Sequence, residues 1–192
     1  NEDGGETKMI EVTVNGVSFS SLGLGVKRAD IPVLPPTRDH TVEIAERDGE
    51  LDFGSDYGPR IVNIECILMA DDPVIDYHRK VAKLATIFNA KKGDMVFTFN
   101  FRPGLRYVGR YAGTMPIEKI IFDGNVTIPI RMNDPFPEGE EKVFETTITS
   151  SPHSILIESE GDEPASPVIT LTNTGSNTIK GFIIENEYLL EG

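Results

Sequence analysis

The sequence has one cysteine, no tryptophan and no long hydrophobic run, and these shortages exclude several classes of protein. A lone cysteine, Cys66, cannot form a disulfide within the chain, which fits assembly in a reducing compartment. No apolar stretch approaches the roughly 18 residues of a membrane-spanning helix, so we expect no membrane insertion. Basic residues are also scarce: 18 Lys and Arg against 31 Asp and Glu give a net charge of −13. That balance would repel nucleic-acid phosphates.

What the chain does contain is enough apolar material for a packed core. Of its 192 residues, 39% are hydrophobic. Residues 1–8 have no hydrophobic side chain and lack the basic start and apolar stretch of a secretion signal. We interpret them as a disordered leader or an expression remnant, with a solvated native tail as the alternative. The apolar pattern begins at Met9, and the sequence predicts a folded domain over residues 9–137.

Alternating apolar and polar residues predict a mainly β domain. Residues 10–14 and 17–20 flank Asn15-Gly16, the strongest short signal for a hairpin turn. Further strands are predicted at 22–27, 61–69, 95–101, 105–112, 117–122 and 126–132, with turns at Pro103-Gly104 and Asp123-Gly124. Residues 30–38 carry three prolines and read as an extended arm or loop. Residues 49–59, rich in Gly and Asp, read as a long hairpin tip.

One segment, residues 72–91, has the period of an amphipathic helix. Asp71 or Asp72 can cap its start, and Pro73 suits its first turn. Lys91, Lys92 and Gly93 favour its end. The face predicted to be buried comprises Val74, Tyr77, His78, Val81, Leu84, Ala85 and Phe88.

The composition changes near residues 134–139, where turn residues precede a strongly acidic segment. We place a domain boundary there. Residues 138–192 predict short strands at 143–148, 154–157, 168–171 and 179–184, which are few for an independent sandwich of about 100 residues. This segment therefore reads as the start of a second β module, incomplete or completed by packing on a neighbour.

The search for chemistry yields no catalytic, cofactor or metal site. His40, His78 and His153 stand in separate contexts without metal-ligand spacing, and His78 is predicted to be a core or interface residue. Helix capping explains Asp71, Asp72 and Asp76 better than a bound cation does. A solvated hairpin tip explains Asp48, Asp52 and Asp56 better than a calcium loop does. Cys66 is predicted to be a buried thiol rather than a nucleophile.

A cluster of arginines and aromatics follows the helix. Arg102, Arg106 and Arg110 alternate with Phe99, Phe101, Tyr107 and Tyr111. The composition is similar to a platform for single-stranded nucleic acid. On two antiparallel strands, a core face and a solvated or subunit-contact face explain it better. Gly23-Leu24-Gly25 lacks the third glycine and the helix of a phosphate-binding loop.

The order of these motifs resembles the distal tail protein family of siphophages and prophages, the hub component of the tail tip. The resemblance covers about residues 9–137. It lies in 15–24, in the hairpin 42–53, in the strand 60–64 before the single helix, in 97–107 with its Pro-Gly turn, and in Asn133-Asp134-Pro135-Phe136 at the domain end. Residues 166–176 resemble the opening of the galectin-like, carbohydrate-binding-like module that often follows in this family.

The resemblance implies a tail-tube-like β-sandwich with one packed helix, assembling into a hexameric ring. Such a ring joins the tail tube to the host-adsorption apparatus, with the tail tube, tape-measure and tail-associated adsorption proteins as partners. It implies a location at the virion tail tip after assembly in the host cytoplasm, and no enzyme activity. Cell-wall carbohydrate is a further expected ligand of the C-terminal module. The alternative is a carbohydrate-binding β-sandwich adhesin that recognises host cell-wall sugar.

Overall fold

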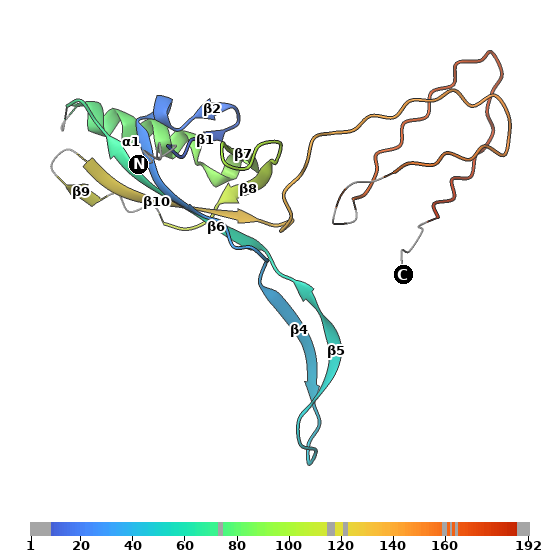
Figure 1. Ribbon diagram of the computed structural model, residues 1–192, viewed down its shortest axis with the longest axis horizontal. Helices are drawn as coiled ribbons and strands as arrows, with labels where there is room; N and C mark the ends of the chain where they lie inside the picture. Colours follow the sequence, from blue (N-terminus) through green and yellow to red (C-terminus); the bar gives the residue numbers. More distant parts are fainter. Residues whose placement is uncertain are drawn as a thin grey trace, which may run out of the picture. The chain divides into compact units, whose positions relative to one another are not determined.

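The computed structural model describes residues 9–72, 75–114, 118–120, 123–158, 161, 163 and 165–187, with the backbone alone at 118–120 and 123. The chain divides into two compact units, Asn1–Ile155 and Leu156–Gly192. The helices and strands assigned to it all belong to the first unit (Figure 1). They are β1 (Val12–Val14), β2 (Val17–Ser18), a 3₁₀ turn (Ser20–Leu22), β3 (Leu24–Asp30), β4 (Thr37–Glu43), β5 (Glu50–Tyr57), β6 (Arg60–Met69), α1 (Ile75–Ile87), a 3₁₀ turn (Ala90–Lys92), β7 (Met95–Phe99), β8 (Tyr107–Tyr111), β9 (Glu118–Ile120) and β10 (Asp123–Met132).

Most strands pair in one continuous path, in the order β2-β1-β7-β8-β10-β6-β3, with β9 added to β10. The two halves of this path are joined between β8 and β10 by two residue pairs, Tyr111 with Ile130 and Arg110 with Arg131. Side chains from both halves meet in one core, which includes Val12, Phe97 and Ile64. The mainly β, sandwich-like fold predicted from the sequence is confirmed.

Two of the predicted strand patterns are reproduced closely. Asn15 and Gly16 have φ angles of 48° and 77°, which is the left-handed geometry that a tight hairpin between β1 and β2 requires. In β6, Val62, Ile64, Cys66 and Leu68 are all buried, and the intervening residues are more exposed. The period of two in the sequence therefore selects the core face.

The helix is confirmed, but its extent and its buried face differ from the prediction. Asp72 accepts a hydrogen bond from the backbone N–H of Ile75 at 2.8 Å, as expected of a cap; Pro73 and Val74 lie outside the described residues. Tyr77, Leu84 and Phe88 are buried and Val81 partly so, whereas His78 and Ala85 are exposed. The prediction that these two belong to the buried face was wrong, because they lie at the edge of a narrower apolar stripe. The alternative for His78, a residue at an interface, remains a prediction.

The helix also ends earlier than expected, at Ile87 rather than near Lys91. Asn89 is extended, with ψ of 104°, and its side chain accepts a hydrogen bond from the N–H of Lys91. That contact begins a separate 3₁₀ turn over Ala90–Lys92, and Gly93 closes this turn with φ of 96°. Gly93 therefore ends the 3₁₀ turn and not the helix. Lys92 still supports the end of the helix as predicted, because its Nζ donates a hydrogen bond to the carbonyl of Thr86 in the last turn of α1 at 2.8 Å.

The glycine-rich segment 49–59 is mostly strand, so its prediction as a hairpin tip was wrong. β5 pairs with β4 over almost its whole length, and the tip is confined to residues 44–49. The register shifts between Asp39 and Thr41, and Gly54 has φ of 93° at that point. This glycine therefore forms a bulge within the ladder rather than a turn. The proline arm predicted over 30–38 is outside any strand at 31–36 only, because Asp30 ends β3 and residues 37–38 begin β4.

Two further predictions were wrong. Asp123-Gly124 is not a turn, because these residues open β10 and pair with Ile120 and Lys119 of β9. The strands expected at 143–148, 154–157, 168–171 and 179–184 are not formed in the described part of that region, where no residue is in a strand. Their apolar side chains are exposed, up to 95% for Val168. Alternation alone cannot form a strand without a neighbour to pair with and a layer to cover it. The domain boundary near 134–139 remains a prediction.

Candidate functional site

The residues predicted from the sequence as chemical candidates stay apart in the fold. His40 lies on β4, His78 on the exposed side of α1, where it meets Tyr77 edge-on at 5.7 Å, and His153 is exposed near the end of the first unit. Across the described residues, no group of three or more His, Cys, Asp and Glu side chains could hold a metal ion.

The two aspartate groups have structural partners. Asp76 accepts hydrogen bonds from Lys80 Nζ at 2.8 Å and from the N–H of Asp71 at 3.0 Å, and these contacts lower its pKa. On the hairpin, Asp56 binds Arg38 Nε at 2.9 Å and His40 Nε2 at 3.3 Å. Desolvation opposes the ionised form of Asp56, but the bonds from His40 and Arg38 outweigh it and lower the pKa. Asp76 therefore supports the start of the helix, as predicted. Asp52 and Asp56 were predicted to lie in a solvated hairpin tip, but they lie within β5, where Asp56 pairs with side chains of β4.

Cys66 is a core residue. It is 1% exposed in the middle of β6, and burial raises the pKa of its thiol to about 12. A neutral thiol without access to solvent is neither a nucleophile nor a metal ligand. The prediction of a buried thiol is confirmed.

The arginine and aromatic cluster separates onto two faces. Phe99 and Tyr107 are buried edge-to-face at 5.1 Å, whereas Arg106 and Arg110 are exposed and pair with Glu138 and Asp94 at 3.0 and 3.1 Å. This is the core face and outer face expected of paired strands.

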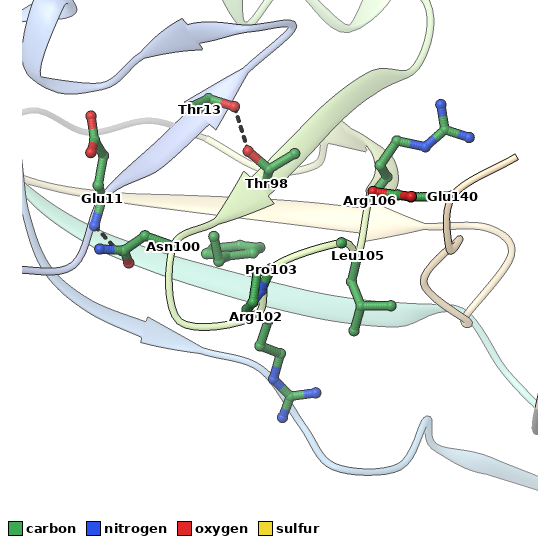
Figure 2. A pocket seen from close by; sticks show the side chains of 11 residues that line it. Glu11, Thr13, Thr98, Asn100, Arg102, Pro103, Leu105, Arg106 and Glu140 are labelled. Carbon is green, nitrogen blue, oxygen red and sulfur yellow. Dashed lines mark hydrogen bonds between the residues drawn. The ribbon is translucent and has the colours of Figure 1, made fainter.

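Beside this cluster, an open groove of about 400 Å³ runs along the outer side of β1 and β7 (Figure 2). Thr13 and Thr98 share a hydrogen bond of 2.7 Å across it, and Asn100 accepts one from the N–H of Glu11. Its lining contains no histidine or cysteine. Figure 2 shows Arg102 turned away from Arg106, so the groove does not gather the arginines around one ligand.

One charged core residue escaped the sequence analysis. Arg60, the first residue of β6, is only 4% exposed, and its Nε has no hydrogen-bond partner in the described structure. Burial lowers the pKa of its guanidinium. The alternation of the strand could have predicted this burial, since Arg60 is two residues before Val62 and so lies on the same face as Val62 and Ile64.

The most unusual surface in the first unit is the hairpin of β4 and β5. These strands pair only with each other and project from the sheet as a two-stranded arm (Figure 1). Apart from half-buried Leu51, every residue of the two strands is exposed. At the base, Gly58 donates its N–H to the carbonyl of Pro36 at 2.6 Å, and the ring of Tyr57 meets Phe136 at 5.7 Å.

The register gives this hairpin two different faces. Val42 lies opposite Leu51, and Arg38 lies opposite Asp56, which places these residues on one face. Phe53, two residues after Leu51, extends the apolar part of this face, and it is 67% exposed. The opposite face carries Asp39, Thr41, Glu43, Glu50 and Asp52. One face is thus apolar toward the tip, and the other is acidic.

Comparison with known proteins identifies a family to which this fold corresponds. Residues 18–132 match a family described as the phage tail protein RIFT-related domain. The chain belongs to this family. The match spans β2 to β10, and so includes the hairpin, the helix and nearly all of the sheet. The curated proteins provide no match to this phage tail protein.

A solved structure shares the fold of this phage tail protein. It is the Dit (gp 19.1) protein of phage SPP1, whose structure is described as a paradigm of the hub adsorption apparatus in phages that infect Gram-positive bacteria. The TM-score is 0.60 at 20% sequence identity, over 69% of the present chain and 53% of the SPP1 protein. The chain thus spans about half the length of that protein. No helix among the described residues is long and apolar enough to cross a membrane.

Proposed function

We propose that this chain is a ring-forming subunit of the hub at the tip of a phage tail, where six copies join the tail tube to the host-adsorption apparatus. Membership of the tail family supports a structural role in the virion tail. The likeness in fold to the SPP1 hub protein favours the tail tip within it. The observation that carries the proposal is the β4–β5 hairpin, which pairs with no other strand of the described chain.

An isolated two-stranded hairpin is at best marginally stable in water. Its exposed apolar side chains and open edges are therefore best explained by cover from another molecule. Each strand of about eight residues reaches roughly 25 Å, which suffices to extend onto a neighbour. A closed ring needs two different complementary patches on each subunit, and a projecting arm supplies one of them.

We assign the ring to residues 9–137 and the start of a galectin-like module to residues 138–192. The tail tube protein, the tape-measure protein and the adsorption proteins would contact the ring, and cell-wall carbohydrate would bind the module. Support for the module lies in apolar residues such as Val143, Val168 and Ile183, which are 75%, 95% and 88% exposed and need a second layer. A free-standing carbohydrate adhesin is less well supported, since the family match lies in residues 18–132.

Light scattering on the purified full chain tests the proposal. A hexamer has six times 21.1 kDa, about 127 kDa, and an adhesin module would be a monomer. Deleting residues 48–58 or 30–38 should abolish the ring, because these segments form the arm and its approach. Deleting residues 138–192 should leave it intact. If only the C-terminal deletion abolished the hexamer, the interface would lie in residues 138–192, and the assignment of the ring to residues 9–137 would be overturned.

A further inference from the structure

The acidic face of the hairpin holds a pair of like charges at close range. Glu43 lies directly opposite Glu50, and Asp39 and Asp52 extend the same face on either strand. Like charges opposite each other destabilise a strand pair. Among the described residues, Asp39, Glu43 and Glu50 have no ion pair or side-chain hydrogen bond, and Asp52 accepts only the N–H of Gly54 at 2.8 Å. Nothing in the described subunit compensates this face.

The outer face of the sheet holds the opposite arrangement. Arg110 of β8 lies directly opposite Arg131 of β10, at the short join between the two halves of the sheet. Arg106 lies two positions before Val108 on the same outer face of the β8 segment. Arg106 and Arg110 each have one carboxylate partner, but Arg131 is exposed and has none within the described structure. The subunit therefore holds three adjacent arginines against two carboxylates.

We propose that the acidic face of the β4–β5 hairpin binds the arginines of β8 and β10 on a second copy of this chain. The hairpin face carries two opposed glutamates without a partner in the described subunit, and the sheet face carries an excess arginine, Arg131, beside Arg110. The two faces are therefore complementary between subunits. Complementary patches of this kind set the register and the choice of partner at an interface. They are also two different patches on one chain, which is the condition for a closed ring. The inference rests on the proposed ring and names its second patch.

Charge reversal at single positions distinguishes an effect on assembly from an effect on the stability of the subunit. Glu50→Arg replaces the Glu43–Glu50 repulsion with an attraction, and Arg131→Glu does the same beside Arg110. We expect each variant to fold at least as stably as the parent in thermal denaturation. In sedimentation or light scattering of the full chain, each should assemble at least about tenfold more weakly, since like charges then face each other across the interface.

The double variant, Glu50→Arg with Arg131→Glu, should recover assembly, because every interface then holds a swapped pair. Glu141→Arg and Lys83→Glu are the matched controls, since both residues are exposed and they change the net charge by the same amounts. They should assemble like the parent. Normal assembly of Glu50→Arg, or failure of the double variant to recover, would overturn the charge pairing and leave the ring standing. A parent chain that stays monomeric at all concentrations would overturn the ring itself.

Discussion

At the scale of single residues, burial rather than residue type decides which side chains contribute most to the stability of the fold. Leu84 and Lys83 are neighbours on α1, yet Leu84 is 0% exposed in the core and Lys83 lies in solvent. Arg60 is charged and buried, whereas Phe53 is aromatic and exposed. From residue type alone, Arg60 would be expected at the surface and Phe53 in the core. Their burial is the reverse, because Arg60 lies on the core face of β6 and Phe53 lies on the hairpin that projects away from the core.

Leu84→Ala should lower the free energy of unfolding by about 2–5 kcal/mol, because it leaves a cavity between the helix and the sheet. Chemical denaturation of the full chain measures this. Lys83→Ala on the same helix is the control and should change it by less than about 0.5 kcal/mol. A loss that small for Leu84→Ala would mean that this helix face is not packed on the core.

Cys66 should make stability fall at high pH. The folded-state pKa is raised from 9.0 to about 12, so between these values the unfolded chain loses the thiol proton and the folded chain keeps it. The unfolded state is then favoured as the pH rises from about 9 toward 12. Comparing the free energy of unfolding of the parent and Cys66→Ala across pH 8 to 11 isolates this effect. The parent should show the steeper decline, and parallel curves would mean that Cys66 ionises equally in both states.

At the scale of elements, the β4–β5 hairpin stands out among the described elements, because contacts within its own subunit do not explain its stability. Its two strands are joined by their ladder and by the Arg38–Asp56–His40 contacts, but Val42 and Phe53 remain half or more exposed. An apolar side chain of this size releases about 1.5–3 kcal/mol when it is fully buried. That free energy is available to assembly and not to folding of the subunit.

Val42→Ser with Phe53→Ser should therefore weaken ring assembly by about tenfold or more while leaving the melting temperature of the dissociated subunit unchanged. Sedimentation over a range of concentrations measures the first quantity, and thermal denaturation at high dilution the second. Ile75→Ser is a matched control, since Ile75 is 68% exposed and Phe53 is 67% exposed. Equal assembly of the hairpin variant and the control would show that the apolar face is not buried in the ring.

At the scale of the whole molecule, the last described strand ends at Met132, but contacts with the fold continue beyond it. The ring of Phe136 meets Tyr57 of β5. Glu138 and Arg106 exchange both backbone hydrogen bonds at 2.8 Å and form an ion pair of 3.0 Å. Residues 9–137 contain every strand of the described residues and the complete described core, so we predict that this fragment folds alone.

Circular dichroism of the fragment 9–137 should show a mainly β spectrum with a cooperative thermal transition. A fragment ending at Gly139 retains Glu138 and should melt a few degrees higher, since about 1 kcal/mol shifts the melting temperature of a domain this size by about 4 °C. A random-coil spectrum for both fragments would mean that the acidic segment is part of the fold.

The sequence by itself determined the local structure wherever the spacing of apolar residues or a turn signal along the chain was enough to select it. Alternation predicted β6, Asn15-Gly16 predicted the first hairpin, and the period of the helix predicted that Leu84 is buried, because each depends on neighbours along the chain. Only the tertiary structure decided what depends on distant partners. The strand at Glu50–Tyr57 exists because β4 lies beside it. The apolar runs after residue 142 form no strand in the described part of that region, where no neighbouring strand pairs with them. The opposition of Glu43 to Glu50, and of Arg110 to Arg131, is a matter of register, which pairing fixes and composition cannot.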